Sequence, residues 1–97
     1  MEQIEFTYPA KRKVNKRAHV GVVGSGDLEV LLEPAEGDLA HVVIRTSVNG
    51  FSDTWKAVLD RFFTKYDGAV RIQINDAGGT PGNVQLRLEQ AVEASER

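Results

Sequence analysis

The sheet of this chain is predicted most clearly by residues 21–34, GVVGSGDLEVLLEP. Residues 19–23 and 28–33 each suit a strand, and the turn between them holds one serine, Ser25, between two glycines. Glycine permits the positive φ angles that tight hairpin turns require. We therefore predict a hairpin whose tip exposes the hydroxyl of Ser25, where a group could be attached.

Apolar and polar residues alternate in several further segments, which is typical of strands with one buried face. These segments are residues 3–8, 41–45 and 70–75. Turn signals separate the segments at residues 24–27, 36–38 and 49–50. Strands of this kind belong to a largely antiparallel sheet that is covered on one side only.

A first helix is expected from an N-cap at Ser52 or Asp53 to a stop at Gly68. Its apolar stripe has helical spacing and consists of Trp55, Val58, Leu59, Phe62 and Tyr66. This aromatic stripe indicates a core face rather than a cofactor site. The helix would cover one face of the sheet.

A second helix is expected after Thr80 and Pro81, because proline suits the first helical turn. Residues 84–88 also alternate like a strand, but the helix formers in residues 88–97 favour a helix. One side of this helix would carry Val84, Leu88, Ala91 and Ser95.

Together these patterns predict a single α+β domain over residues 1–97. Its fold would be one largely antiparallel sheet of about four to five strands with two helices packed on one face. We expect the core to include Val30, Val42, Ile44, Trp55, Phe62 and Ile72.

The composition narrows the possible functions. The chain has 97 residues and no cysteine, so disulfides, thiolate metal sites and a cysteine nucleophile are excluded. Any thiol chemistry would need a thiol brought in from outside. The absence of an apolar run of eighteen residues and of a signal peptide pattern makes a soluble, cytoplasmic protein with no membrane partner the expectation.

Five cations are concentrated between Lys11 and Arg17, although the net charge of the chain is only −2. These cations are Lys11, Arg12, Lys13, Lys16 and Arg17. No aromatic residues are interleaved with them, so a solvated loop is favoured over a nucleic-acid site. The alternative role is docking to a phosphate-bearing group or to an acidic partner surface.

No catalytic or metal site is predicted. His19 and His41 fall in expected strands without neighbouring ligands at suitable spacing, so both are interpreted as sheet residues. The turn at Ser25 lacks the strand-to-helix context of a hydrolase nucleophile. Residues 76–82 precede a helix and could meet a phosphate, but a plain strand-to-helix connection is favoured.

The chain resembles the acyl carrier (δ) subunit family of malonate decarboxylase. The resemblance begins with residues 21–34 and extends through 45–50, 75–76 with 79–82, and 86–90, in order along nearly the whole chain. The acyl carrier subunit of citrate lyase is similar in outline, with a weaker match around Ser25.

The resemblance implies a carrier that catalyses nothing itself. Ser25 would hold, through a phosphodiester, 2′-(5″-phosphoribosyl)-3′-dephospho-CoA, whose terminal thiol bears acetyl or malonyl as a thioester. The implied partners are an acyltransferase subunit, decarboxylase subunits and the enzyme that loads the prosthetic group.

The residues near Ser25 have different expected roles. Asp27 could accept a hydrogen bond within the turn, or it could be recognised by the loading enzyme. Gly24 and Gly26 are expected to keep the approach to Ser25 open. Three alternatives to this function are a citrate lyase-like carrier, a sheet-edge binding adaptor and a small serine-dependent esterase.

Overall fold

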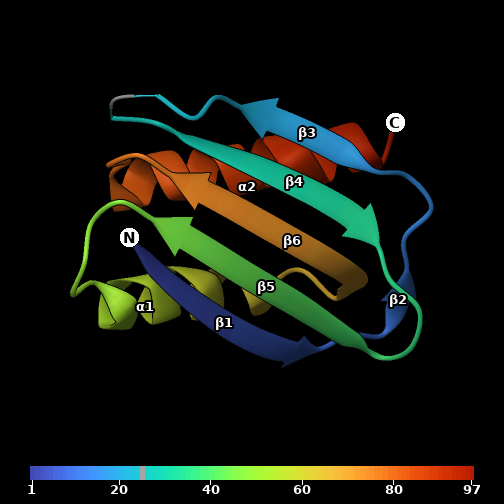
Figure 1. The fold of residues 1–97 in the computed structure, drawn as a ribbon. Helices are drawn as coiled ribbons and strands as arrows, with labels where there is room; N and C mark the ends of the chain where they lie inside the picture. The colour runs from blue at the N-terminus through green and yellow to red at the C-terminus, as the bar shows by residue number, and fades with distance from the viewer. Residues whose placement is uncertain (25) are drawn as a thin grey trace.

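The computed structural model describes residues 1–24 and 26–97 (Figure 1). Its elements, in chain order, are β1 (Glu2–Pro9), β2 (Arg12–Lys13), β3 (Ala18–Gly21), β4 (Leu28–Pro34), β5 (Leu39–Thr46), α1 (Ser52–Phe63), β6 (Gly68–Asp76) and α2 (Pro81–Ser95). None of the helices in the described part of the chain has an apolar stretch long enough to cross a bilayer.

The strands form one sheet in the order β1-β5-β6-β4-β3, and the short β2 pairs with the start of β6. The predicted α+β class and largely antiparallel sheet are confirmed. Over the described residues the sheet has six strands, which is larger than expected, and it is not purely antiparallel. β5 and β6 run parallel because α1 connects them as a crossover, which returns the chain in the same direction.

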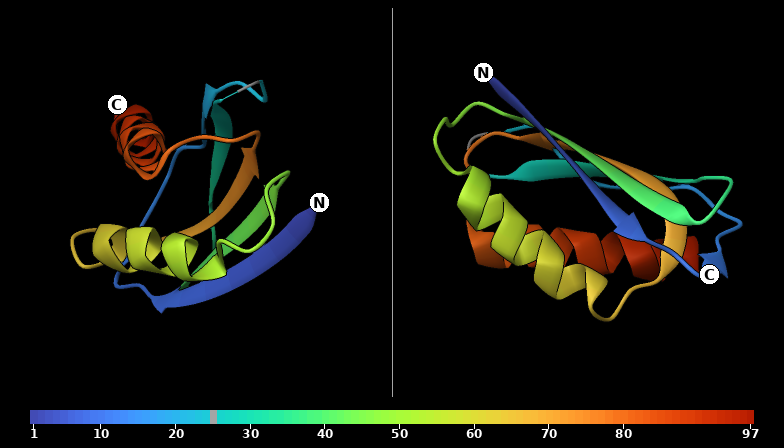
Figure 2. Two further views of the ribbon diagram at one scale, coloured as in Figure 1. Left: turned by 90° about the vertical axis from the view of Figure 1, so that its left-hand side faces the viewer. Right: turned by 90° about the horizontal axis from the view of Figure 1, so that it is seen from below.

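Both helices pack on one face of the sheet, as predicted (Figure 2). All six residues expected in the core are buried: Val30, Val42, Ile44 and Ile72 are fully inaccessible, and Trp55 and Phe62 are 6% exposed. The orientation predicted for α1 is therefore confirmed. The opposite face of the sheet, which faces the viewer in Figure 1, carries mainly polar side chains such as Gln3, Arg45 and Asn75.

The start of α1 differs from the prediction in its cap. The N-cap position is occupied by Phe51, which makes no side-chain capping bond, and Ser52 is already helical. The helix ends at Phe63, well before Gly68, which instead begins β6. Tyr66 therefore lies beyond the helix, yet its side chain remains in the core.

The start of α2 agrees with the prediction. Thr80 is the N-cap, and its hydroxyl accepts a hydrogen bond from the backbone amide of Asn83 at 3.2 Å. Pro81 occupies the first turn, and the buried residues of the helix are the four that were predicted. The choice of helix over strand for residues 84–88 is confirmed.

The strand expected over residues 19–23 is shorter than predicted. β3 ends at Gly21, whose φ of 80° takes the chain out of the extended conformation. Val22 and Val23 consequently lie outside the sheet and are 63% and 60% exposed. The connection from β3 to β4 is a longer loop than a two-residue hairpin.

Candidate functional site

The glycine-rich turn between β3 and β4 is held against the loop that joins β6 to α2. The amide of Gly26 donates to the carbonyl oxygen of Ala77 at 2.8 Å, and the amide of Ala77 donates to the carbonyl oxygen of Asp27 at 2.9 Å. Within the turn, the amide of Asp27 donates to the carbonyl oxygen of Gly24 at 2.9 Å. Ser25 itself, the predicted attachment residue, lies outside the described residues.

The two glycines beside Ser25 differ in their backbone conformation. Gly26 has a φ of 75°, which other residues rarely adopt, and a Cβ atom there would meet nothing within 4 Å. Gly24 has no positive φ, and a Cβ atom there would come only within 3.9 Å of the Val22 side chain. The positive φ therefore explains why residue 26 is glycine, because the space beside it would admit a Cβ atom.

Asp27 connects the turn to α2. Its Oδ1 accepts hydrogen bonds from the Leu28 amide at 2.7 Å and from Arg87 Nε at 3.3 Å. Its Oδ2 accepts a hydrogen bond from Arg87 Nη2 at 2.8 Å. Hydrogen bonds from Arg87 and then from the Leu28 amide hold the pKa of the Asp27 carboxyl below its ordinary value. The carboxylate is therefore ionised at neutral pH and forms a bidentate ion pair.

Asn83 completes this connection from the first turn of α2. Its side-chain amide donates to the Gly26 carbonyl oxygen at 3.4 Å and to Asp27 Oδ1 at 3.3 Å. Sequence reasoning did not single out Asn83 or Arg87 as site residues. Their spacing of four residues predicts that they share one helix face. This spacing does not identify what that face contacts.

The residues around the turn fit an attached phosphodiester. The N-terminus of α2 carries a partial positive charge and adjoins the turn through Asn83. The guanidinium of Arg87, bound to Asp27 and to Gln90, has N–H groups beyond those that these bonds use. A Cβ atom placed on Gly26 would meet nothing within 4 Å, so this side of the turn is open.

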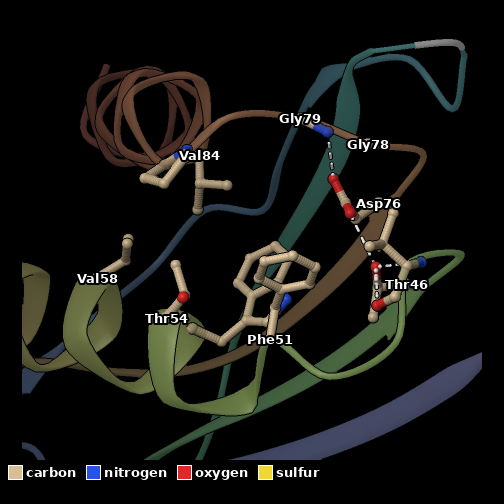
Figure 3. Close-up of a pocket in the computed structure, with 11 residues that line it drawn as sticks. Thr46, Phe51, Thr54, Val58, Asp76, Gly78, Gly79 and Val84 are labelled. Carbon is tan, nitrogen blue, oxygen red and sulfur yellow. Dashed lines mark hydrogen bonds between the residues drawn. The ribbon is translucent and has the colours of Figure 1, made fainter.

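An apolar groove of about 390 Å³ lies next to this turn, between the N-terminal halves of α1 and α2 (Figure 3). Val48, Phe51, Trp55, Val58 and Val84 are among its lining residues. The groove is located at the carboxyl ends of the parallel strands β5 and β6, where ligands of α/β sheets commonly bind. Sequence reasoning did not predict it.

One end of the groove is polar. Asp76 is only 7% exposed; its Oδ2 accepts a hydrogen bond from the Thr46 hydroxyl at 2.9 Å and its Oδ1 accepts one from the Gly79 amide at 2.8 Å. These bonds fix the loop from β6 to α2. Residues 76–82 thus form the strand-to-helix connection that the sequence favoured.

The two histidines lie in strands, as interpreted from the sequence. His19 in β3 and His41 in β5 are both exposed, and His19 Nε2 lies 2.8 Å from Glu29 Oε2. In the described ranges 1–24 and 26–97, no cluster of three or more His, Cys, Asp or Glu side chains could hold a metal ion.

The chain matches a known protein family over most of its length. A profile of the malonate decarboxylase delta subunit (MdcD) family matches residues 15–95. The malonate decarboxylase acyl carrier proteins of Azotobacter vinelandii and Pseudomonas syringae pv. tomato are 47% and 50% identical to this chain. Each alignment covers 96% of this chain and 95% of the relative.

A solved structure is also similar over nearly the whole chain. It is described as the crystal structure of a Pseudomonas malonate decarboxylase hetero-tetramer in complex with malonate. The matched chain has a TM-score of 0.93 and 46% sequence identity, with coverage of 97% of this chain and 98% of that one. The chain therefore belongs to the malonate decarboxylase delta subunit family.

Proposed function

We propose that this chain is the acyl carrier subunit of a malonate decarboxylase and that Ser25 is its attachment residue. The observation that carries the proposal is the full-length similarity to proteins named malonate decarboxylase acyl carrier protein. The glycine-flanked turn supports it, because no described atom lies within 4 Å of a Cβ atom placed on Gly26.

The proposed group is 2′-(5″-phosphoribosyl)-3′-dephospho-CoA, joined to Ser25 by a phosphodiester. When attached, it supplies the terminal thiol that holds acetyl or malonyl as a thioester. The chain has no cysteine of its own, which is consistent with a thiol provided by such a group. The N-terminus of α2 and the guanidinium of Arg87 would stabilise the negative charge of the phosphodiester.

Asp27 has two roles in this proposal. Its bonds to the Leu28 amide and to Arg87 orient the turn, and its carboxylate would help the loading enzyme to recognise the site. The ion pair with Arg87 offsets the repulsion between the carboxylate and the phosphodiester. Gly24 and Gly26 would keep the approach to residue 25 free of side chains.

The carrier would serve several partners of one complex. We propose an acyltransferase subunit, the decarboxylase subunits and the loading enzyme as those partners. The similar chain in the hetero-tetramer structure supports assembly with other subunits. The arm would move acyl groups between their sites at high effective concentration because it remains tethered.

Intact mass spectrometry tests the proposal. Protein purified from its native host should show a nucleotide-sized covalent increase in mass, whereas recombinant protein made without the loading enzyme should have the unmodified mass. A binding adaptor and a serine esterase would be unmodified in both preparations. Unmodified protein isolated from a fully active native complex would contradict the proposal.

A further inference from the structure

The apolar groove described above has no role in the proposed attachment of the arm, yet it shares a wall with the attachment turn. Gly78 lines the groove, and a Cβ atom placed on Gly78 would lie 3.9 Å from the Cα of Gly26. The turn that contains Gly26 therefore borders the loop that lines the groove. Figure 3 shows the lining side chains between α1 and the loop of Gly78 and Gly79.

The charges of the groove restrict what can occupy it. Of the described residues that line it, none is basic, and the single charged side chain is the buried Asp76. An anionic ligand such as a nucleotide or a phosphate would meet no cation and would be repelled by this carboxylate. The occupant should therefore be neutral and largely apolar, with a few hydrogen-bond donors.

The polar end of the groove provides acceptors for such donors. The Asp76 carboxylate accepts two hydrogen bonds from its own chain, from Thr46 and from Gly79, and a carboxylate has capacity for about four. The amide N–H groups of a pantetheine unit could use the remaining lone pairs, while its dimethyl carbon would contact the apolar walls.

We propose that the groove binds the neutral pantetheine segment of the carrier's own prosthetic arm between visits to partner active sites. This inference rests on the proposed function, because the arm must first be attached at Ser25. The volume of about 390 Å³ lies within the range of about 300–1,000 Å³ that is usual for small-molecule sites. The phosphates of the arm remain outside, near the turn and Arg87.

The tether makes weak binding sufficient. A short flexible tether gives an effective concentration in the millimolar range. A groove with a Kd on the order of 1 mM for free pantetheine would then be occupied in about half of the molecules, and partner subunits could still withdraw the arm readily. Occupation would also cover Phe51, which is 50% exposed.

A spin label on the arm provides the direct test. Because the chain has no cysteine, a nitroxide reagent attaches only to the thiol of the arm once the acyl group has been removed. In the labelled holo-protein, we expect paramagnetic broadening of the NMR signals of Phe51, Val58 and Val84, and little at residues 11–17. Broadening confined to residues 21–29 would overturn the inference.

A pair of variants tests the groove itself. Thr54 is an exposed lining residue, so Thr54→Phe should block the mouth and reduce the broadening at Val58 and Val84 at least threefold. Leu86→Phe adds an aromatic ring at an exposed position of α2 outside the groove and should leave the broadening unchanged. Equal broadening in Thr54→Phe and wild type would contradict the proposal.

Intact mass separates this inference from the proposed function. Wild-type protein that carries no adduct after incubation with the loading enzyme would show that the proposed function is wrong. Wild-type protein that carries the full adduct but shows no broadening in the groove would refute the groove proposal alone.

The indole N–H signal of Trp55, which lines the groove, gives an independent readout without a spin label. Its chemical shift should differ between loaded and unloaded protein.

Discussion

The two ends of the sheet expose side chains of different character. The turn end, formed by the β3–β4 turn and the loops after β5 and β6, exposes apolar side chains, including those of Val22, Val23 and Phe51. The basic end, which lies around β2 in Figure 1, is formed by residues 11–17. Its five cationic side chains are exposed. β6 links the two ends, since Arg12 pairs with Gly68 and Ala77 contacts the glycine-rich turn.

At the basic end, part of the charge is bound to the chain itself. Arg12 Nε lies 3.1 Å from an Asp67 oxygen, and another guanidinium nitrogen lies 3.3 Å from a Glu96 oxygen. The guanidinium carbon also lies over the Tyr66 ring, 5.3 Å from its centroid. Lys16 Nζ donates to the carbonyl oxygen of Arg97. These contacts join the basic run to the C-terminal segment. The interpretation as a solvated loop therefore holds only for some residues of the basic run.

The separation of the two ends bears on the expected role of the basic run. Eight residue steps of β6, at about 3.3 Å each, place the ends roughly 26 Å apart. A phosphodiester on the turn would therefore lie beyond the reach of Arg12 and Lys13, which pair with the start of β6. We therefore expect the basic run to assist docking to a partner or to the loading enzyme, rather than to hold the phosphate that joins the arm to the chain.

The largest loss of stability is predicted for substitution of the buried Trp55 in α1, which packs near the turn end. Trp55→Ala should lower the free energy of unfolding by about 3 to 5 kcal/mol, because it leaves a cavity at a buried aromatic position. Phe51→Ala, at a half-exposed ring of the same groove, should cost less than about 1 kcal/mol. Urea unfolding measures both, and equal losses would contradict the described burial of Trp55.

A second prediction concerns the glycines that shape the turn end. Gly26→Ala should cost about 1 to 2 kcal/mol through its positive φ alone. Gly21→Ala should cost more, because its φ is similar and its Cβ atom would also overlap the carbonyl oxygen of Leu28. If urea unfolding ranked the two variants in the reverse order, the described course of the chain out of β3 would be wrong.

A third prediction tests the ion pair of the turn end by pH. The pKa of Asp27 is lower in the folded state than its unfolded value of about 3.9, so the carboxylate stabilises the fold above that pH. This contribution is lost as the pH falls through the folded pKa. The stability advantage of wild type over Asp27→Asn should therefore be present at pH 7 and shrink below about pH 4. An advantage independent of pH would show that the pair with Arg87 contributes nothing.

The smallest change in stability is predicted at the basic end. Replacing Lys11, Lys13 and Arg17 together by glutamine leaves the ion pairs of Arg12 intact, so the free energy of unfolding should change by less than about 1 kcal/mol. Loading or acyl transfer should slow, most strongly at low ionic strength, where the Debye length exceeds about 10 Å. Unchanged rates and an unchanged salt dependence would leave these residues as solvated surface.

The fold was largely predictable because its signals are local. Period-two alternation indicated β1 and β4 to β6, and Thr80 with Pro81 indicated the start of α2. The parallel pairing of β5 with β6 was not predicted, since alternation is the same in parallel and antiparallel strands. β2 has only two residues, too few for any periodic pattern.

The site was predictable only in part. Glycine spacing located the turn, but the bond between Asp27 and Arg87 joins residues sixty positions apart and depends on how α2 packs. The groove is likewise formed by residues of α1, α2, two loops and the ends of β5 and β6, so no one segment contains its pattern. Contacts between distant segments could not be derived from local sequence.

Location of the adduct tests the central claim most directly. Wild type, Ser25→Ala and Ser47→Ala would each be incubated with the loading enzyme and analysed by peptide mass mapping. Ser47 is an exposed serine at the same end of the sheet and serves as the matched control. We predict an adduct on the peptide that contains residue 25 in wild type and in Ser47→Ala, and none in Ser25→Ala, with unchanged melting. A loaded Ser25→Ala protein would contradict the assignment of Ser25.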